Sequence, residues 1–426
     1  MNKSFLTSNF LLCFLFFQAA PFLAGFNLSY AGGPLFITDN NSPVVYPNSN
    51  ITLHVENGDL GILSNAIATT LLQEGFDLWN DVSTSTINLS ADQTQLALDI
   101  NETNFETYLP TLDGTELNDT DNLNPVIFDD DGKIIEQIFG VGQTGLLGFA
   151  GSFINSETGD FIEGFILING SNTGSNTKIK LIFAHEVGHF IGLDHSQVDI
   201  DNEESSSELP LLCFTTGSGN YPLMYPFGCR LTDDLHADDI SAVSALYPST
   251  DLNDNFGNLE GIFVDESGDA ILGANIWAED TSSGKTYSII SDYLKQGTGF
   301  YRLLLPAGTY TLHANSINTS FTAGSSVGPY AINNTDISFS DPHPITEITY
   351  FGSEAPNDEI ITITTNETFN INFSNVGALI KSTNNNSDED DSIADLFGSL
   401  SHLTLIILVL TVLLLRRSMK YQTDNH

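Results

Sequence analysis

The residues with the clearest chemistry lie in one short stretch, AHEVGHFIGLDHS, at positions 184–196. It holds three of the nine histidines in the chain. On a helix, residues i and i+4 share a face, so His185 and His189 can direct their imidazoles at one metal ion. Gly192 can adopt the left-handed conformation that ends a helix, and the reversed chain would then return His195 as a third ligand.

The number and kind of these ligands predict zinc at a catalytic rather than a structural site. Three neutral nitrogens leave one tetrahedral position open for water. The metal lowers the pKa of that water from 15.7 toward about 7, so a carboxylate can act as a base near neutral pH. Glu186, beside the first ligand, is the catalytic residue that we assign. The alternative is a helix with incidental surface histidines.

The flanking sequence predicts the elements that position these side chains. Apolar residues alternate or form short runs in four segments, which is typical of strands, and recur every three to four residues in a fifth, which indicates a helix. The expected strands are 51–56, 125–129, 145–155 and 161–169, and the expected helix is 63–82. The metal-binding helix follows the last strand, so we expect an α+β domain that ends near residue 250.

Within this domain, HEVGHFIGLDHS resembles the zinc motif of the metzincin metalloproteases, which pairs with a downstream methionine turn. PLMYP supplies Met224 for that turn, and its Tyr-Pro is similar to the matrixin branch. LTDDLHADDISAVSALYP resembles the closing matrixin helix, in which the pair Asp238 and Asp239 supports the turn. The resemblance covers about 32–250 and implies a metzincin-type catalytic domain, a twisted mixed sheet plus an active-site helix.

The resemblance also implies an activity, a zinc-dependent endopeptidase with a protein or peptide substrate. Glu186 would be the general base for the zinc-activated water, and an extended substrate would lie antiparallel to an edge strand at 146–155. Met224 would form a floor under the metal. The implied pocket residues are Pro222, Tyr225 and Pro226. The rival interpretation is a surface adhesion or binding protein with a protease-like domain that does not turn over substrate; Glu186 argues against it, because a binding protein needs no base.

Two cysteines remain after the first, Cys13, which lies in an N-terminal apolar segment. In an oxidising compartment, Cys213 and Cys229 are expected to form a disulfide. The alternative is two free buried thiols.

The segment FDDDGK offers Asp129 and Asp131 as oxygen ligands of the kind that calcium prefers. Matrixins often hold calcium in this region, so the resemblance supports a structural calcium ion here in addition to one catalytic zinc. The alternative is that Asp-Gly simply forms a turn.

The residue pattern of the sequence changes after residue 250. GNLEGIFVDESGDAILGANIWAED and GTGFYRLLLPAGTYTLHA show short alternating runs with Gly and Pro turns, which predict a β-sandwich over 251–378. These segments resemble the carboxypeptidase regulatory-like, transthyretin-type domain. They carry no catalytic pattern, so the sandwich is interpreted as a spacer, a substrate-presenting module or a stabilising appendage.

The ends of the chain and its charge bear on location. Residues 1–31 are typical of a secretory signal peptide. An acidic disordered stalk is expected at 379–395, a transmembrane helix at 396–415, and a cytoplasmic tail with basic residues at 416–426. The protein is therefore expected at the cell surface, anchored to the membrane with its catalytic domain outside, unless a sorting protease removes the tail. The net charge of −42 argues against a nucleic-acid partner.

Overall fold

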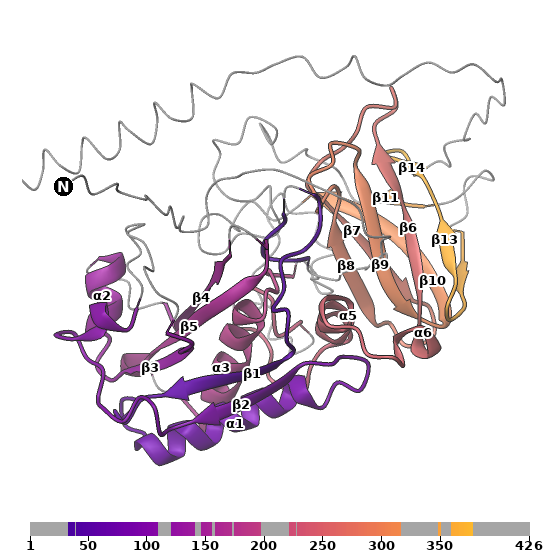
Figure 1. Ribbon diagram of the computed structural model, residues 1–426. Helices are drawn as coiled ribbons and strands as arrows, with labels where there is room; N and C mark the ends of the chain where they lie inside the picture. Colours follow the sequence, from indigo (N-terminus) through magenta and orange to yellow (C-terminus); the bar gives the residue numbers. More distant parts are fainter. Residues whose placement is uncertain are drawn as a thin grey trace, which may run out of the picture. The chain divides into compact units, whose positions relative to one another are not determined.

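The computed structural model describes most of the chain between residues 33 and 377. The described ranges are 33–38, 40–109, 121–140, 146–155, 158–172, 174–196, 221–226, 228–316, 348–350 and 359–377 (Figure 1). Residue contacts divide the chain into two compact units, Met1–Ile380 and Lys381–His426. Everything described below lies in the first unit.

The fold class predicted from the sequence was wrong as a whole. The described chain is a mixed α/β structure with several sheets. In those same ranges, no helix is long and apolar enough to cross a membrane. The segment predicted to do so, 396–415, lies outside the described residues, as do 1–31, 379–395 and 416–426. That prediction depended on hydropathy and on the basic residues that follow the segment, which report its polarity and not its conformation.

The first part of the structure is built on a sheet with the described strand order β2-β1-β3-β5-β4. The strands are β1 (Asn50–Val55), β2 (Asn88–Asp92), β3 (Pro125–Asp129), β4 (Gly148–Ile154) and β5 (Phe161–Asn169). Neighbours pair in parallel from β2 to β5, and β4 pairs antiparallel with β5. The strand predicted to form an edge, 146–155, is therefore β4, at one end of the described sheet.

Helices cover both faces of this sheet. They are α1 (Asn65–Asn80), α2 (Lys133–Phe139) and α3 (Asn176–Phe190), with short 3₁₀ turns at Phe105–Thr107 and Gly170–Asn172. Alternation along β3 sends Phe128 into the core with α1 and α3, and Ile127 into a second core with α2. The two long helices pack closely, and the Trp79 indole N–H donates to the Ala184 carbonyl at 2.9 Å.

The second part begins with α5 (Ala237–Leu246) and α6 (Leu252–Asn255) and continues as two sheets. One holds β7 (Ala274–Asp280), β8 (Thr286–Ile290), β10 (Gly308–Ser316), β11 (Ile348–Thr349) and β12 (Ile361–Ile363); the other holds β6 (Phe256–Val264), β9 (Phe300–Pro306), β13 (Thr368–Asn370) and β14 (Phe373–Ser374). We call these two sheets the sandwich. Most of its buried apolar residues belong to the same hydrophobic cluster as those around α3.

Candidate metal centre

Helix α3 carries the first two histidines and has clear start and stop signals. The Ser175 hydroxyl accepts the Lys178 N–H at the N-terminus of the helix. At the other end Gly192 has φ +95°, a conformation that favours glycine, and its N–H donates to the His189 carbonyl at 3.0 Å. The chain therefore reverses directly after the helix.

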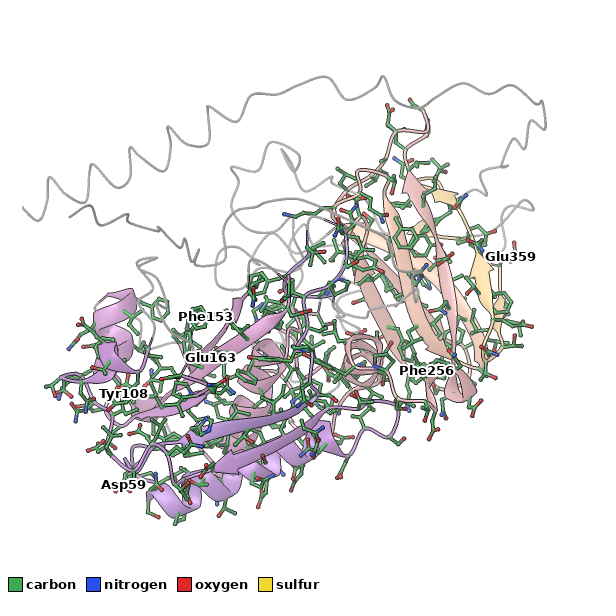
Figure 2. All side chains as sticks on the ribbon, viewed as in Figure 1. Asp59, Tyr108, Phe153, Glu163, Phe256 and Glu359 are labelled. Carbon is green, nitrogen blue, oxygen red and sulfur yellow. The ribbon has the colours of Figure 1, made fainter. Side chains whose placement is uncertain are left out.

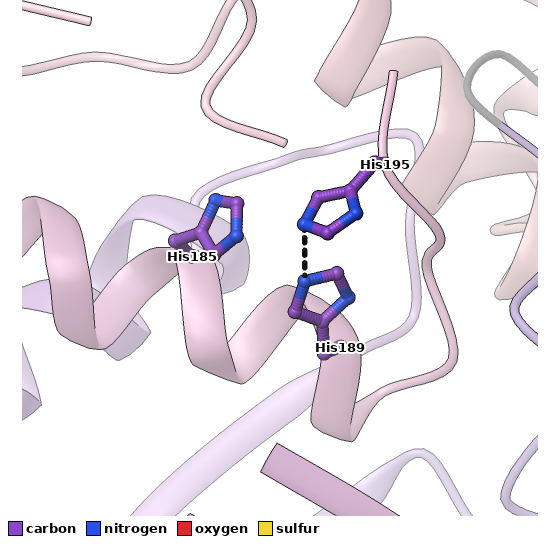
Figure 3. Close-up of side chains that lie close together, drawn as sticks. All are labelled: His185, His189 and His195. Carbon is purple, nitrogen blue, oxygen red and sulfur yellow. Dashed lines mark hydrogen bonds between the residues drawn. The ribbon is translucent and has the colours of Figure 1, made fainter. Parts of the chain in front are cut away.

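The reversal brings three imidazoles together (Figure 3). His185 and His189 lie one turn apart on α3, and His195 approaches them from the loop. One ring nitrogen from each lies within 4.8 Å of the others, and the Nε2 atoms of His189 and His195 are 3.0 Å apart. Among the described residues, this is the group of three or more His, Cys, Asp or Glu side chains that could hold a metal ion.

Backbone carbonyls orient both helix histidines. Nδ1 of His185 lies 2.7 Å from the Leu223 carbonyl, and Nδ1 of His189 lies 2.9 Å from the Leu193 carbonyl. Because a carbonyl oxygen only accepts, each Nδ1 carries the proton and each Nε2 keeps its lone pair. Burial lowers the pKa of His185 and, more strongly, that of His189, so both rings are neutral at neutral pH. Neutral imidazoles with an unprotonated Nε2 are the form that binds a metal.

Glu186 directly follows His185 on α3, and its side chain lies against the end strand β4. A Cβ placed on Gly148 would lie 2.7 Å from Glu186 Cγ and 2.8 Å from its Oε1, so any larger residue there would displace this carboxyl group. The side chain is buried, and burial raises the pKa of Glu186 to about 8. A cation bound at the histidines would lower that pKa again.

The predicted methionine turn contacts the histidine-bearing segments and is held by one carboxylate. Asp239 accepts the N–H of Leu223 at 2.7 Å and of Met224 at 3.0 Å. The turn also holds the histidine group, because the Leu223 carbonyl accepts from His185 Nδ1 and the Met224 carbonyl accepts the Ser196 N–H at 2.8 Å. The neighbouring carboxylate of Asp238 does not support the turn; it bonds elsewhere, as described below.

Gly188, between the two helix ligands, provides the space for Met224. A Cβ at Gly188 would lie 2.2 Å from the Met224 sulfur. In Gly188→Ala, the free-energy cost of this clash should exceed the gain of roughly 1 kcal/mol that alanine gives over glycine inside a helix. The free energy of unfolding, measured by urea denaturation, should fall by about 1–2 kcal/mol.

Met224→Ala is the matched partner for this test. Alone it should open a cavity and cost about 2–5 kcal/mol. Combined with Gly188→Ala it should cost less than the sum of the two single changes, because the clash has been removed. Strict additivity would contradict the proposed contact.

His236 begins α5 and makes stability depend on pH. Its Nδ1 accepts the Asp238 N–H at 3.1 Å, and burial, then the charges of Arg230 and Lys285, lower its pKa from 6.5 to about 3. Between those values the unfolded chain binds a proton that the folded chain does not. The stability that neutral His236 contributes is therefore complete above pH 6.5 and is lost as the pH falls toward 3, by about 1.4 kcal/mol per pH unit.

His236→Asn keeps an acceptor at the start of the helix but removes this titration. We expect the free energy of unfolding of the variant to fall less steeply than that of the wild type between about pH 6 and pH 4. Parallel curves for the two proteins would show that His236 does not carry the effect.

The three predicted pocket residues differ in how far the structure buries them. Pro222 and Tyr225 are buried, and the Tyr225 ring packs on Tyr221 with centroids 4.7 Å apart. Pro226 is half-buried. Of the three, Pro226 is thus the one with appreciable exposed surface, and a pocket formed by all three stays a prediction.

The structure also describes three of the four residues predicted for a disulfide and a calcium site. Cys229 is buried and disulfide-bonded, and its expected partner Cys213 lies outside the described residues. Asp129 is buried and accepts the N–H groups of Ile134 and Ile135 at the start of α2. Asp131 instead pairs with Lys133 at 2.5 Å. The two carboxylates therefore have separate partners, and the structure does not bring them together around one cation.

Sequence reasoning missed another buried glutamate, Glu163 on β5. Burial raises its pKa to about 7, and its carboxylate accepts the Asn122 N–H at 2.6 Å. Glu163 lines a pocket with Tyr108 and Phe153 (Figure 2). Alternation along β5 places it on the same face as Phe165, away from α3. No motif in the sequence marks it.

No protein-family model and no curated protein sequence matches this chain. Among solved structures, the Bacillus anthracis TIE protein is similar to part of it, with 13% identity and a TM-score of 0.16. The match covers 28% of this chain and 16% of that one, so this chain spans a small part of the length of that protein. A likeness with so low a TM-score carries no argument about fold or function.

Proposed function

We propose that this chain is a zinc-dependent endopeptidase of the matrixin-like metzincin type. One observation carries the proposal: three imidazoles converge at the end of α3, Glu186 directly follows the first of them, and its carboxyl group lies against the first residue of an end strand. Ligands, base and a strand that can bind an extended peptide are thus within one small region.

The donor set fits zinc. Three imidazole nitrogens, each able to present Nε2, are the ligands of many catalytic zinc sites, and second-layer carbonyls orient two of them here. A bound zinc ion would supply Lewis-acid activation of water and of the substrate carbonyl.

Glu186 would accept and return the proton during the reaction. With a cation nearby, its carboxylate would be charged near neutral pH despite burial. It would accept a proton from the attacking water and hold it at a carboxylate oxygen until the leaving amine takes it. Burial against Gly148 restricts the side chain to this place, so the base needs little reorganisation during the reaction.

Strand β4 would position the substrate. Because it ends the described sheet, an extended peptide could add to its outer edge by main-chain hydrogen bonds. Gly148, the first residue of β4, is the residue that touches Glu186. A peptide paired along β4 would therefore pass close to the base.

Metal analysis and a cleavage assay on the purified intact chain test this function. We expect about one zinc per chain. Casein or gelatin should be cleaved, cleavage should stop when a chelator removes the metal, and added zinc should restore it. Zinc without cleavage of any protein or peptide offered would favour a binding protein instead. A chain that binds no metal would overturn the proposal.

A further inference from the structure

One buried carboxylate connects the metal centre with the sandwich. Asp238 lies in the first turn of α5 and is 1% exposed. One of its oxygens accepts the Ser196 hydroxyl at 2.5 Å, and the other accepts the main-chain N–H of Ser288 at 2.7 Å. Ser196 directly follows the ligand His195, and Ser288 lies in the middle of β8. A relay of two hydrogen bonds thus joins β8 to a metal-binding loop.

The Ser288 N–H is available because of its place in the sheet. Strand β8 ends its sheet in the described structure and pairs antiparallel with β7. The Ser291 N–H donates to Ala274, which marks a hydrogen-bonded pair of the ladder. Counting back three residues, Ser288 faces Trp277 at a non-hydrogen-bonded position, so its N–H points away from β7. Asp238 is the acceptor that this outward N–H meets.

A second contact holds α5 on the sandwich. The Ser241 hydroxyl, one turn further along the helix, donates to the Leu304 carbonyl on β9 at 2.7 Å. In Figure 1, α5 lies beside β8 and β9, in agreement with the contacts between these elements. Helix α5 therefore cannot shift without breaking its bonds to both sheets.

The same helical turn reaches both sides of the histidine cluster. Asp239 holds Leu223, whose carbonyl orients His185, and Asp238 holds Ser196, next to His195. A buried carboxylate is costly unless its oxygens are hydrogen-bonded, so Asp238 depends on both of its donors to stay in place.

We infer that strand β8 of the sandwich is a positioning element of the metal centre: through the Ser288 N–H, Asp238 and Ser196 it sets the place of His195, and with it the affinity for the metal. The sandwich is then a working part of the metal centre, rather than a spacer. The inference depends on the proposed metal site but not on the proposed cleavage reaction.

The test measures metal binding by the intact chain. Zinc affinity is obtained by competition with a chromogenic chelator, and the visible absorption of bound cobalt reports the ligand geometry. The variants are Ser196→Ala, Ser288→Pro and the two combined. Proline removes the outward N–H without removing a ladder hydrogen bond to β7, and it is tolerated at a sheet edge. We expect each single change to weaken zinc binding about tenfold and alter the cobalt spectrum. The combined variant should lose little more, because both changes break one relay.

Thr286→Pro is the matched control. Thr286 lies two residues earlier on β8, at the same kind of ladder position, and its N–H does not bond Asp238. This variant should keep wild-type zinc affinity. An equal loss in Thr286→Pro, unchanged affinity in Ser288→Pro, or additive losses in the combined variant would each overturn the inference.

If Ser288→Pro does not fold, the test compares the zinc affinity of Asp238→Asn with that of Asp238→Ala. Asparagine has the same shape, can accept the Ser288 N–H and can donate to Ser196, so it should recover most of the affinity that alanine loses. If both variants bind zinc equally well, the relay has no role. A wild-type chain that binds neither zinc nor cobalt would instead refute the proposed metal site itself.

Discussion

Replacing Glu186 by glutamine is expected to lower kcat for peptide cleavage by about 10²–10⁴-fold, while zinc content stays at the wild-type level. Glutamine has the size and shape of glutamate, so it should fit between α3 and Gly148 without moving the histidines. It cannot accept the proton of the attacking water. The measurement is kcat on one peptide substrate for both proteins, each assayed at equal zinc loading.

Glu163→Gln is the control for this experiment. Glu163 is also a buried glutamate whose pKa is raised by burial, but it lies on the sheet face opposite α3. Glutamine keeps the oxygen that accepts the Asn122 N–H, so folding should be preserved. We expect wild-type kcat from this variant. If Glu186→Gln keeps more than about a tenth of wild-type kcat, Glu186 is not the general base.

Asp239→Ala is expected to cause the largest loss of stability. Its buried carboxylate accepts three main-chain N–H groups, those of Leu223, Met224 and His236, at 2.7, 3.0 and 2.9 Å. Alanine would leave these donors without that acceptor, at a cost of about 1–3 kcal/mol for each group that stays buried. Because the substitution also removes the burial cost of the carboxylate, we expect a net loss of about 3–5 kcal/mol. Urea denaturation of the metal-free protein measures it.

Asp233→Ala serves as its counterpart. Asp233 lies in the segment before α5, its side chain is half-exposed, and it pairs with Lys180 of α3. An ion pair with an exposed partner contributes little, so this variant should lose less than about 1 kcal/mol. Similar losses in the two variants would mean that the methionine turn does not depend on Asp239.

Local elements were predictable because local physics decides them. The predicted strands at 125–129 and 161–169 are β3 and β5 with the same residues, and the predicted helix at 63–82 is α1 with two residues fewer at each end. Apolar periodicity and turn residues lie within a few positions of one another, so the sequence displays them directly.

The partners of a charged or apolar segment were harder to predict than the elements themselves. The aspartates of FDDDGK suggested one calcium site, but Asp129 turns inward to α2 and Asp131 outward to Lys133, because adjacent turns set their directions. The apolar run at 396–415 led to a fold class that the described structure does not support. In both cases the composition of a segment identified the chemical type of its side chains but not the residues that surround them.

The sequence by itself determined which side chains can bind the metal. His185 and His189 share a helix face through their four-residue spacing, and Gly192 permits the turn that returns His195. These relations follow from helix geometry and from the freedom of glycine at positive φ.

Only the tertiary structure decided how that group is held. The carbonyl that orients His185, the room for Met224 beside Gly188 and the relay from Ser288 through Asp238 to Ser196 all join residues far apart in the chain. Such contacts depend on how packed elements meet, and no local pattern encodes where a buried N–H or carboxylate will find its partner.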